Sequence, residues 1–146
     1  MIKIICIGKI KEQYLNDLIN DYKTRISKYH KIEIIELKDS NIKEEMSELL
    51  KVINSKDYNI CMDIDGKEYS SIELSKLIND TFTEGYGNIS FIIGGSDGLD
   101  ESIKNMCNKR LSFSRLTFPH GLFRGILLEQ IYRSFKIINN ESYHKW

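Results

Sequence analysis

Residues Asn88–Leu99 read NISFIIGGSDGL, and this stretch decides the fold. A short apolar run, Ile89–Ile93, is followed directly by Gly94 and Gly95, and Gly98 comes three residues later. A buried strand that ends in a glycine turn before a helix is how α/β proteins build a ligand crevice, because glycine lets backbone amides approach a bound molecule. The stretch therefore predicts an α/β fold with a small-molecule site after this strand.

The same stretch also permits a different chemistry. Its segment Gly94-Gly95-Ser96-Asp97-Gly98 fits the serine-hydrolase pattern G-x-S-x-G, with His120 or His144 available as the base. Two glycines before the serine widen the turn, whereas a nucleophile elbow needs a strained one, and no acid stands out on a separate late strand. A serine hydrolase using Ser96 remains an alternative from the residues alone.

Length and composition predict one soluble globular domain spanning 1–146, with 41% hydrophobic and 29% charged residues. No apolar run approaches the ~20 residues of a membrane helix. The apolar run at Met1–Ile7 is interrupted by Lys3 and is too short for a signal peptide, so it predicts a first strand. Three cysteines without C-x-x-C spacing favour a reducing, cytoplasmic compartment, and the scattered histidines give no metal motif.

Charge is unevenly distributed although the formal net charge is zero. Residues 101–146 hold eight Lys and Arg side chains against three acids, which gives this third a charge of +5. Such a basic region suits a polyanion such as RNA, and a solvated surface of no special function is the alternative.

Apolar periodicity predicts strands and helices in strict alternation. We expect strands at Ile2–Gly8, Ile32–Leu37, Tyr58–Ile64, Asn88–Ile93 and Leu111–Phe118, and helices at Glu12–Tyr29, Asn41–Ile53, Ser70–Phe82, Asp100–Lys109 and Leu122–Ile138. Asp65-Gly66 is read as a turn, Ser70 with Glu73 as a capping box, and Pro119 as the end of the fifth strand. This order predicts a parallel sheet covered by helices on both faces.

The expected last helix, Leu122–Ile138, is apolar on more than one face. A small monomer cannot bury both faces of such a helix, so the pattern predicts a homodimer.

Four segments of the C-terminal half carry a family resemblance: Phe91–Leu99, Leu111–His120, Leu127–Phe135 and Tyr143–Lys145. In their order and spacing they resemble the RlmH family, the smallest SPOUT (α/β-knot) methyltransferases. The resemblance implies a deep C-terminal trefoil knot and a homodimer. It also implies methylation of N3 of a pseudouridine in helix 69 of 23S rRNA, on the ribosome, with S-adenosylmethionine as the cofactor.

The resemblance also implies which residues bind the cofactor. Met62 and Gly94 match cofactor contacts, and residues 113–118 match the segment that closes around the adenine and ribose. That segment comprises Phe113, Ser114, Arg115, Leu116, Thr117 and Phe118.

The expected substrate residues lie at the chain's end and on the last helix. His144 is the best titratable candidate for the base, with water as the alternative acceptor, and Arg133 is suited to stabilise the developing charge. Tyr143 is expected to stack on the target base, and Lys145 and Arg124 to bind the RNA. A frayed terminus is the competing interpretation of these tail residues. A non-catalytic RNA-binding dimer is an alternative function for the whole chain.

Two departures from the family pattern concern the tail. Gly121 stands where the family usually has glutamine, and Asn140-Glu141-Ser142 replaces a segment that normally contains proline. Without the proline we expect a looser tail. Trp146 extends the usual end, and the sequence gives it no role.

Overall fold

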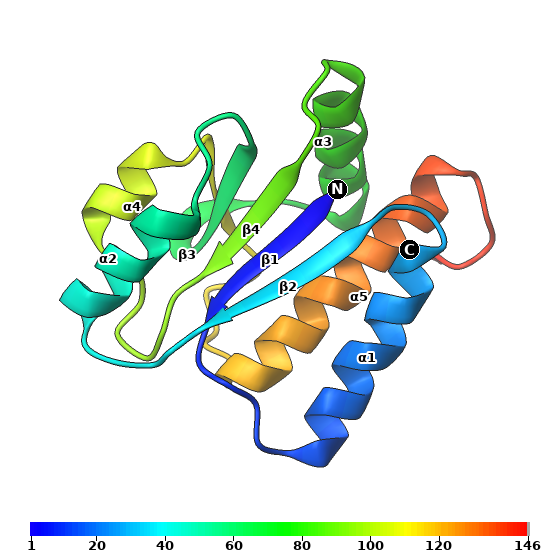
Figure 1. The fold of residues 1–146 in the computed structure, drawn as a ribbon. Helices are drawn as coiled ribbons and strands as arrows, with labels where there is room; N and C mark the ends of the chain where they lie inside the picture. Colours follow the sequence, from blue (N-terminus) through cyan, green and yellow to red (C-terminus); the bar gives the residue numbers. More distant parts are fainter. Residues whose placement is uncertain (146) are drawn as a thin grey trace.

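The structure, a computed structural model, describes residues 1–145, and Trp146 lies outside the described residues. The chain forms a single-domain α/β fold in which strands and helices alternate (Figure 1). The strands are β1 (Ile2–Ile7), β2 (Ile32–Leu37), β3 (Tyr58–Glu68), β4 (Ile89–Ile93) and β5 (Lys109–Ser112). The helices are α1 (Gln13–Ser27), α2 (Ile42–Val52), α3 (Ser71–Thr83), α4 (Glu101–Met106) and α5 (His120–Ile138).

The five strands form one sheet in the order β2-β1-β4-β3-β5, and every neighbouring pair is parallel. Helices α1, α5 and α3 cover one face, and α2 and α4 cover the other (Figure 1). This confirms the predicted parallel α/β sheet. From β1 the chain passes to β2 on one side of the sheet, and from β4 it passes to β5 on the other side, so the order of connections reverses between these two strands. Open parallel sheets bind ligands near such a point, outside the carboxyl ends of their strands.

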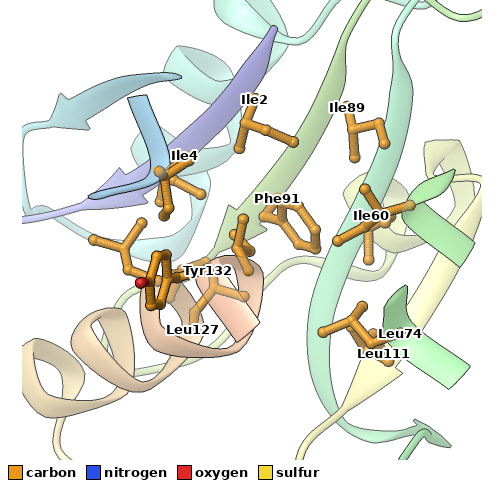
Figure 2. Close-up of a cluster of buried hydrophobic side chains, with 14 of the residues drawn as sticks. Ile2, Ile4, Ile60, Leu74, Ile89, Phe91, Leu111, Leu127 and Tyr132 are labelled. Carbon is orange, nitrogen blue, oxygen red and sulfur yellow. The ribbon is translucent and has the colours of Figure 1, made fainter. Parts of the chain in front are cut away.

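Two apolar cores lie on the two faces of the sheet. On the α1, α3 and α5 face, fully buried Phe91 of β4 lies in a cluster with Ile4 and Ile60 of the sheet and Leu127 of α5 (Figure 2). On the opposite face, Ile5, Ile7, Cys61 and Ile92 pack under α2 and α4. Burial on both faces explains why the central strands read as continuous apolar runs rather than as alternating patterns.

The expected turn at Asp65-Gly66 is wrong, because β3 continues through it to Glu68. The ladder to β5 is irregular here: Met62 and Lys67 both pair with Leu111, with a register shift between them. A Cβ on Gly66 would lie 2.7 Å from the backbone carbonyl of Arg110. The glycine therefore permits a close approach between two strands rather than a reversal of the chain.

The expected fifth strand is also corrected, because β5 ends at Ser112 instead of Phe118. Residues 113–118 form a loop tied by its serines: Ser112 Oγ donates to the Ser114 carbonyl (3.0 Å), and the Leu116 amide donates to Ser114 Oγ (3.0 Å). Pro119 is the N-cap of α5, which begins at His120 rather than at Leu122. The proline thus marks a helix start, where its fixed φ is suitable.

The remaining boundaries agree within a few residues, and the Ser70–Glu73 capping box is confirmed with both of its hydrogen bonds. Within residues 1–145, no helix is both long enough and apolar enough to cross a membrane. The knot implied by the resemblance stays a prediction.

Candidate functional site

An open cleft of about 650 Å³, counting space open to solvent, lies at the carboxyl ends of β4 and β5 and beside the middle of β3. Met62 of β3, Gly94 after β4 and the loop 113–118 form its walls, and His120 and Phe123 of α5 close it. Mostly apolar walls with few polar groups are typical of a small-molecule site.

The glycine turn after β4 is held by its own backbone. The Gly98 amide donates to the Gly95 carbonyl (2.9 Å), and Gly98 has a φ of 78°, which favours glycine. A Cβ on Gly94 would lie 2.6 Å from the carbonyl carbon of Gly98. The conformation of the turn therefore requires a glycine at position 94, and the turn presents its backbone to the cleft.

Seven of the eight residues expected to bind the cofactor line this cleft: Met62, Gly94, Phe113, Ser114, Leu116, Thr117 and Phe118. Arg115 is exposed and is not part of the lining. Leu116 is 72% exposed, so the rim of the cleft carries an apolar side chain that does not pack in the core. The structure brings together residues that lie as far apart in the sequence as Met62 and Phe118.

Asp63 is a cleft residue that the family resemblance did not indicate. Its side chain is buried, and Oδ1 accepts hydrogen bonds from the Asp65 amide (3.1 Å) and from Lys104 Nζ (3.3 Å). Its signal in the sequence is a carboxylate flanked by the apolar residues Met62 and Ile64 within a strand. The cleft therefore holds one buried carboxylate among apolar walls.

A second carboxylate, Glu45 of α2, is buried behind the glycine turn. Its Oε2 accepts from the Ser40 amide (2.9 Å), and a Cβ on Gly95 would lie 2.8 Å from Oε1. Burial raises the pKa of Glu45, and the nearby Asp39 and Asp97 carboxylates raise it further, against the opposing Ser40 hydrogen bond. No sequence signal separates Glu45 from the solvent-facing glutamates of the same helix.

The C-terminal tail forms a separate polar cluster on α5. Glu129 Oε1 accepts from Arg133 Nε (3.1 Å), from Arg133 Nη2 (2.7 Å) and from the Tyr143 hydroxyl (3.0 Å). Arg133 Nη1 lies 3.1 Å from His144 Nδ1, and its guanidinium lies 4.8 Å from the centre of the Tyr143 ring. The three expected catalytic residues, Arg133, Tyr143 and His144, therefore meet, and Glu129 at their centre is the member that sequence reasoning missed.

Further contacts hold the tail against α5. The Tyr143 ring packs edge-on against Tyr132 with 4.9 Å between ring centres, and burial raises the pKa of Tyr143 above its ordinary value. Lys136 and Glu141 form an ion pair (3.2 Å) just before the tail. Residues 141–144 are thus tied to the helix at several points despite the missing proline.

The cleft and the tail cluster do not meet within one chain. Arg133 follows Phe123 by ten residues of α5, which corresponds to about 15 Å along a helix axis. Figure 1 shows α5 running from the side of the sheet where the strands end back toward the side where they begin, and the C-terminal tail lies at that far end of α5. The two halves of the expected site are therefore separated in the protomer.

Two other expected residues have clear places. Lys145 is exposed at the end of the tail. Arg124 is 4% exposed and does not line the cleft; its guanidinium binds Glu36 Oε2 (2.6 Å) and the Gly8 carbonyl (3.1 Å). These contacts tie α5 to the ends of β1 and β2, so in the protomer Arg124 has a structural contact, and its expected RNA contact stays a prediction.

The elements of the hydrolase alternative are not assembled. Ser96 is exposed at the tip of the turn, and in the part of the chain that the structure describes its hydroxyl has no hydrogen bond to a histidine. Among residues 1–145, no group of three or more His, Cys, Asp or Glu side chains is placed to hold a metal ion.

Comparisons with known proteins identify the family of this chain. A family profile described as "Predicted SPOUT methyltransferase" matches residues 1–144. Proteins named ribosomal RNA large subunit methyltransferase H are 48% identical in Clostridium botulinum (strain Alaska E43) and 47% identical in Fusobacterium nucleatum, each over 99% of both chains. A solved structure of a probable methylase family protein from Haemophilus influenzae shares the fold, with a TM-score of 0.53 at 13% identity.

The match covers 99% of this chain and 70% of that structure's chain. At 13% identity, the likeness concerns the fold alone. The family profile and the full-length relatives identify more than a fold, because they match from the first strand through the tail. The chain belongs to the SPOUT methyltransferases, within the ribosomal RNA large subunit methyltransferase H family, and is a methyltransferase.

Proposed function

We propose that this protein transfers the methyl group of S-adenosylmethionine to N3 of a pseudouridine in helix 69 of 23S rRNA, on the ribosome. The observation that carries the cofactor assignment is the convergence of seven expected contact residues on one cleft. The names of the full-length relatives support the rRNA substrate. A ribosomal substrate in turn implies a cytoplasmic enzyme.

The residues of the cleft fit this cofactor. Met62, Leu116 and the aromatic rings of the loop offer apolar surface for an adenine, and backbone groups of the loop can read its edge. When bound, S-adenosylmethionine supplies an already activated methyl group, so the protein's part is to position the acceptor and exclude water.

The separation of cleft and tail supports a homodimer in which each tail completes the partner's cleft. The residues at the start of α5 and on the loop leave apolar side chains exposed, including Leu116 and Leu122. Burying apolar surface yields roughly 25 cal/mol per Å², which favours covering these side chains with a second copy. Two such contacts related by a twofold axis would form two equivalent sites.

We therefore expect a dimer at micromolar concentration in sedimentation experiments. The assembly should persist without the cofactor, because the cleft and the apolar surface are both present in the chain alone. A monomer of about 17 kDa that methylates ribosomes at the full rate would contradict this arrangement.

Lys145 is expected to contact an RNA phosphate, since it is exposed next to the tail cluster. Lys145→Ala should weaken ribosome binding and reduce the slope of log K against log salt by about one unit. The measurement is binding to ribosomal subunits over a series of salt concentrations, with Lys56→Ala, an exposed lysine in the α2–β3 connection, as the matched control. An unchanged slope for Lys145→Ala would contradict the proposed contact between Lys145 and an RNA phosphate.

Ser96→Ala should leave methylation within about twofold of the wild-type rate, because Ser96 is exposed, does not line the cleft, and an exposed substitution changes the free energy of unfolding by about 0.5 kcal/mol or less. The hydrolase alternative demands the opposite, since it makes the Ser96 hydroxyl the nucleophile. Rates are measured with labelled S-adenosylmethionine on ribosomes.

The test of the function has two parts. Calorimetric titration should show saturable S-adenosylmethionine binding, and ribosomes lacking the modification should accept one labelled methyl group in helix 69. Cofactor binding without methyl transfer to any rRNA would reject the proposed substrate. A protein that binds rRNA but not the cofactor would be the non-catalytic RNA-binding dimer.

A further inference from the structure

We infer that His144 acts as a neutral hydrogen-bond donor through Nε2–H, and that Arg133 and Glu129 are positioning residues that fix this state. The inference rests on the proposed methyl transfer to an imide nitrogen. It replaces the expectation that His144 is the base, and it assigns Glu129 a part in the reaction.

The contact between Arg133 and His144 defines the tautomer. Arg133 Nη1 lies 3.1 Å from His144 Nδ1, and a guanidinium has only donors. Nδ1 must therefore accept with its lone pair, which leaves the ring proton on Nε2. A proton on Nδ1 would point at another N–H donor and break the contact.

Glu129 makes the arrangement rigid. Its Oε1 accepts two N–H bonds from Arg133, at 2.7 and 3.1 Å, so the guanidinium cannot turn away from His144 without breaking them. The same oxygen accepts the Tyr143 hydroxyl (3.0 Å), which fixes the residue next to His144. One carboxylate on α5 thus orients both tail residues, and a charge-assisted pair of this kind is stronger than a neutral hydrogen bond.

A donor at Nε2–H can stabilise the charge that develops on the target pseudouridine during methyl transfer. The N3–CH₃ bond forms as the S–CH₃ bond breaks, and sulfur keeps the electron pair; before this step the N3 proton passes to solvent water. Loss of that proton places negative charge on the two carbonyl oxygens that flank N3. A fixed N–H donor aimed at one of them stabilises this charge as an oxyanion hole does.

A substitution series separates a donor from a base. Glutamine carries its amide nitrogen near the position of Nε2 and can donate but cannot take up a proton, so His144→Gln should retain methylation within about tenfold of wild type. His144→Ala removes the donor and should lose about 100-fold. His144→Asn, whose shorter side chain places its amide near Nδ1, should resemble alanine. If His144→Gln is as inactive as His144→Ala, the inference is overturned.

Nitrogen NMR of the ¹⁵N-labelled full-length protein tests the tautomer without relying on activity. At neutral pH the His144 ring should show a protonated Nε2 and an unprotonated Nδ1, and Glu129→Ala should populate the other tautomer. Glu129→Gln, which keeps one acceptor oxygen, should retain more of the wild-type pattern. A wild-type ring protonated at Nδ1 would overturn the inference, whereas absent methylation with the expected ring state would reject only the proposed function.

Discussion

Deleting residues 142–146 should abolish rRNA methylation while leaving S-adenosylmethionine affinity unchanged. The deleted segment carries Tyr143 and His144, which meet Arg133 and Glu129 far from the cleft. Losing the groups that orient and stabilise the acceptor should lower the rate at least about 100-fold. Calorimetry with the cofactor and a ribosome methylation assay, on the same preparation, measure the two effects separately.

The deletion is expected to leave the fold intact, because the Glu129–Arg133 pair lies within α5 and does not need the tail. Tyr143→Phe is a milder companion variant that removes only the hydroxyl contact to Glu129. A truncated protein that methylates ribosomes at the wild-type rate would show that the tail has no part in the reaction.

Gly94→Ala should eliminate cofactor binding, with the affinity falling at least about tenfold. The new Cβ would lie 2.6 Å from the Gly98 carbonyl carbon and 3.0 Å from Leu99 Cγ, so the turn must open. Backbone atoms cannot move aside as a flexible side chain can, and a closely packed interior passes the displacement on. The opened turn would no longer present its backbone to the cleft.

Gly87→Ala is the matched control for this substitution. A Cβ at Gly87 has no atom within 4 Å, so the same chemical change should leave cofactor affinity at the wild-type value. Circular dichroism and sedimentation should show that both variants remain folded. Normal affinity in Gly94→Ala would place the cofactor elsewhere.

The sheet could be predicted from the sequence because each central strand is a short apolar run. The segment 111–118 shows where that reasoning fails: LSFSRLTF alternates like a strand, yet only its first two residues pair with β3. From Ser112 on, the serine side chains satisfy loop amides and carbonyls, and the apolar residues line the cleft, with Phe113 also packing against the core. A binding loop and a half-buried strand have the same pattern of side chains.

The candidate site was predictable only where a motif carried it. Met62, Gly94 and the loop came from the family resemblance, and the cleft brings them together. Glu129 forms an ordinary i,i+4 pair with Arg133 within the helix, and its contact with Tyr143 exists only once the tail folds back. Contacts made by a chain reversal have no periodic signature, so this part of the site required the structure.

The most direct test of the account mixes two inactive variants. Gly94→Ala keeps a normal tail but lacks the cleft, and the protein without residues 142–146 keeps the cleft but lacks the tail. After subunit exchange, half of the dimers are mixed and each has one intact site, so about a quarter of wild-type methylation should return. A mixture no more active than its two components would contradict a site shared between subunits.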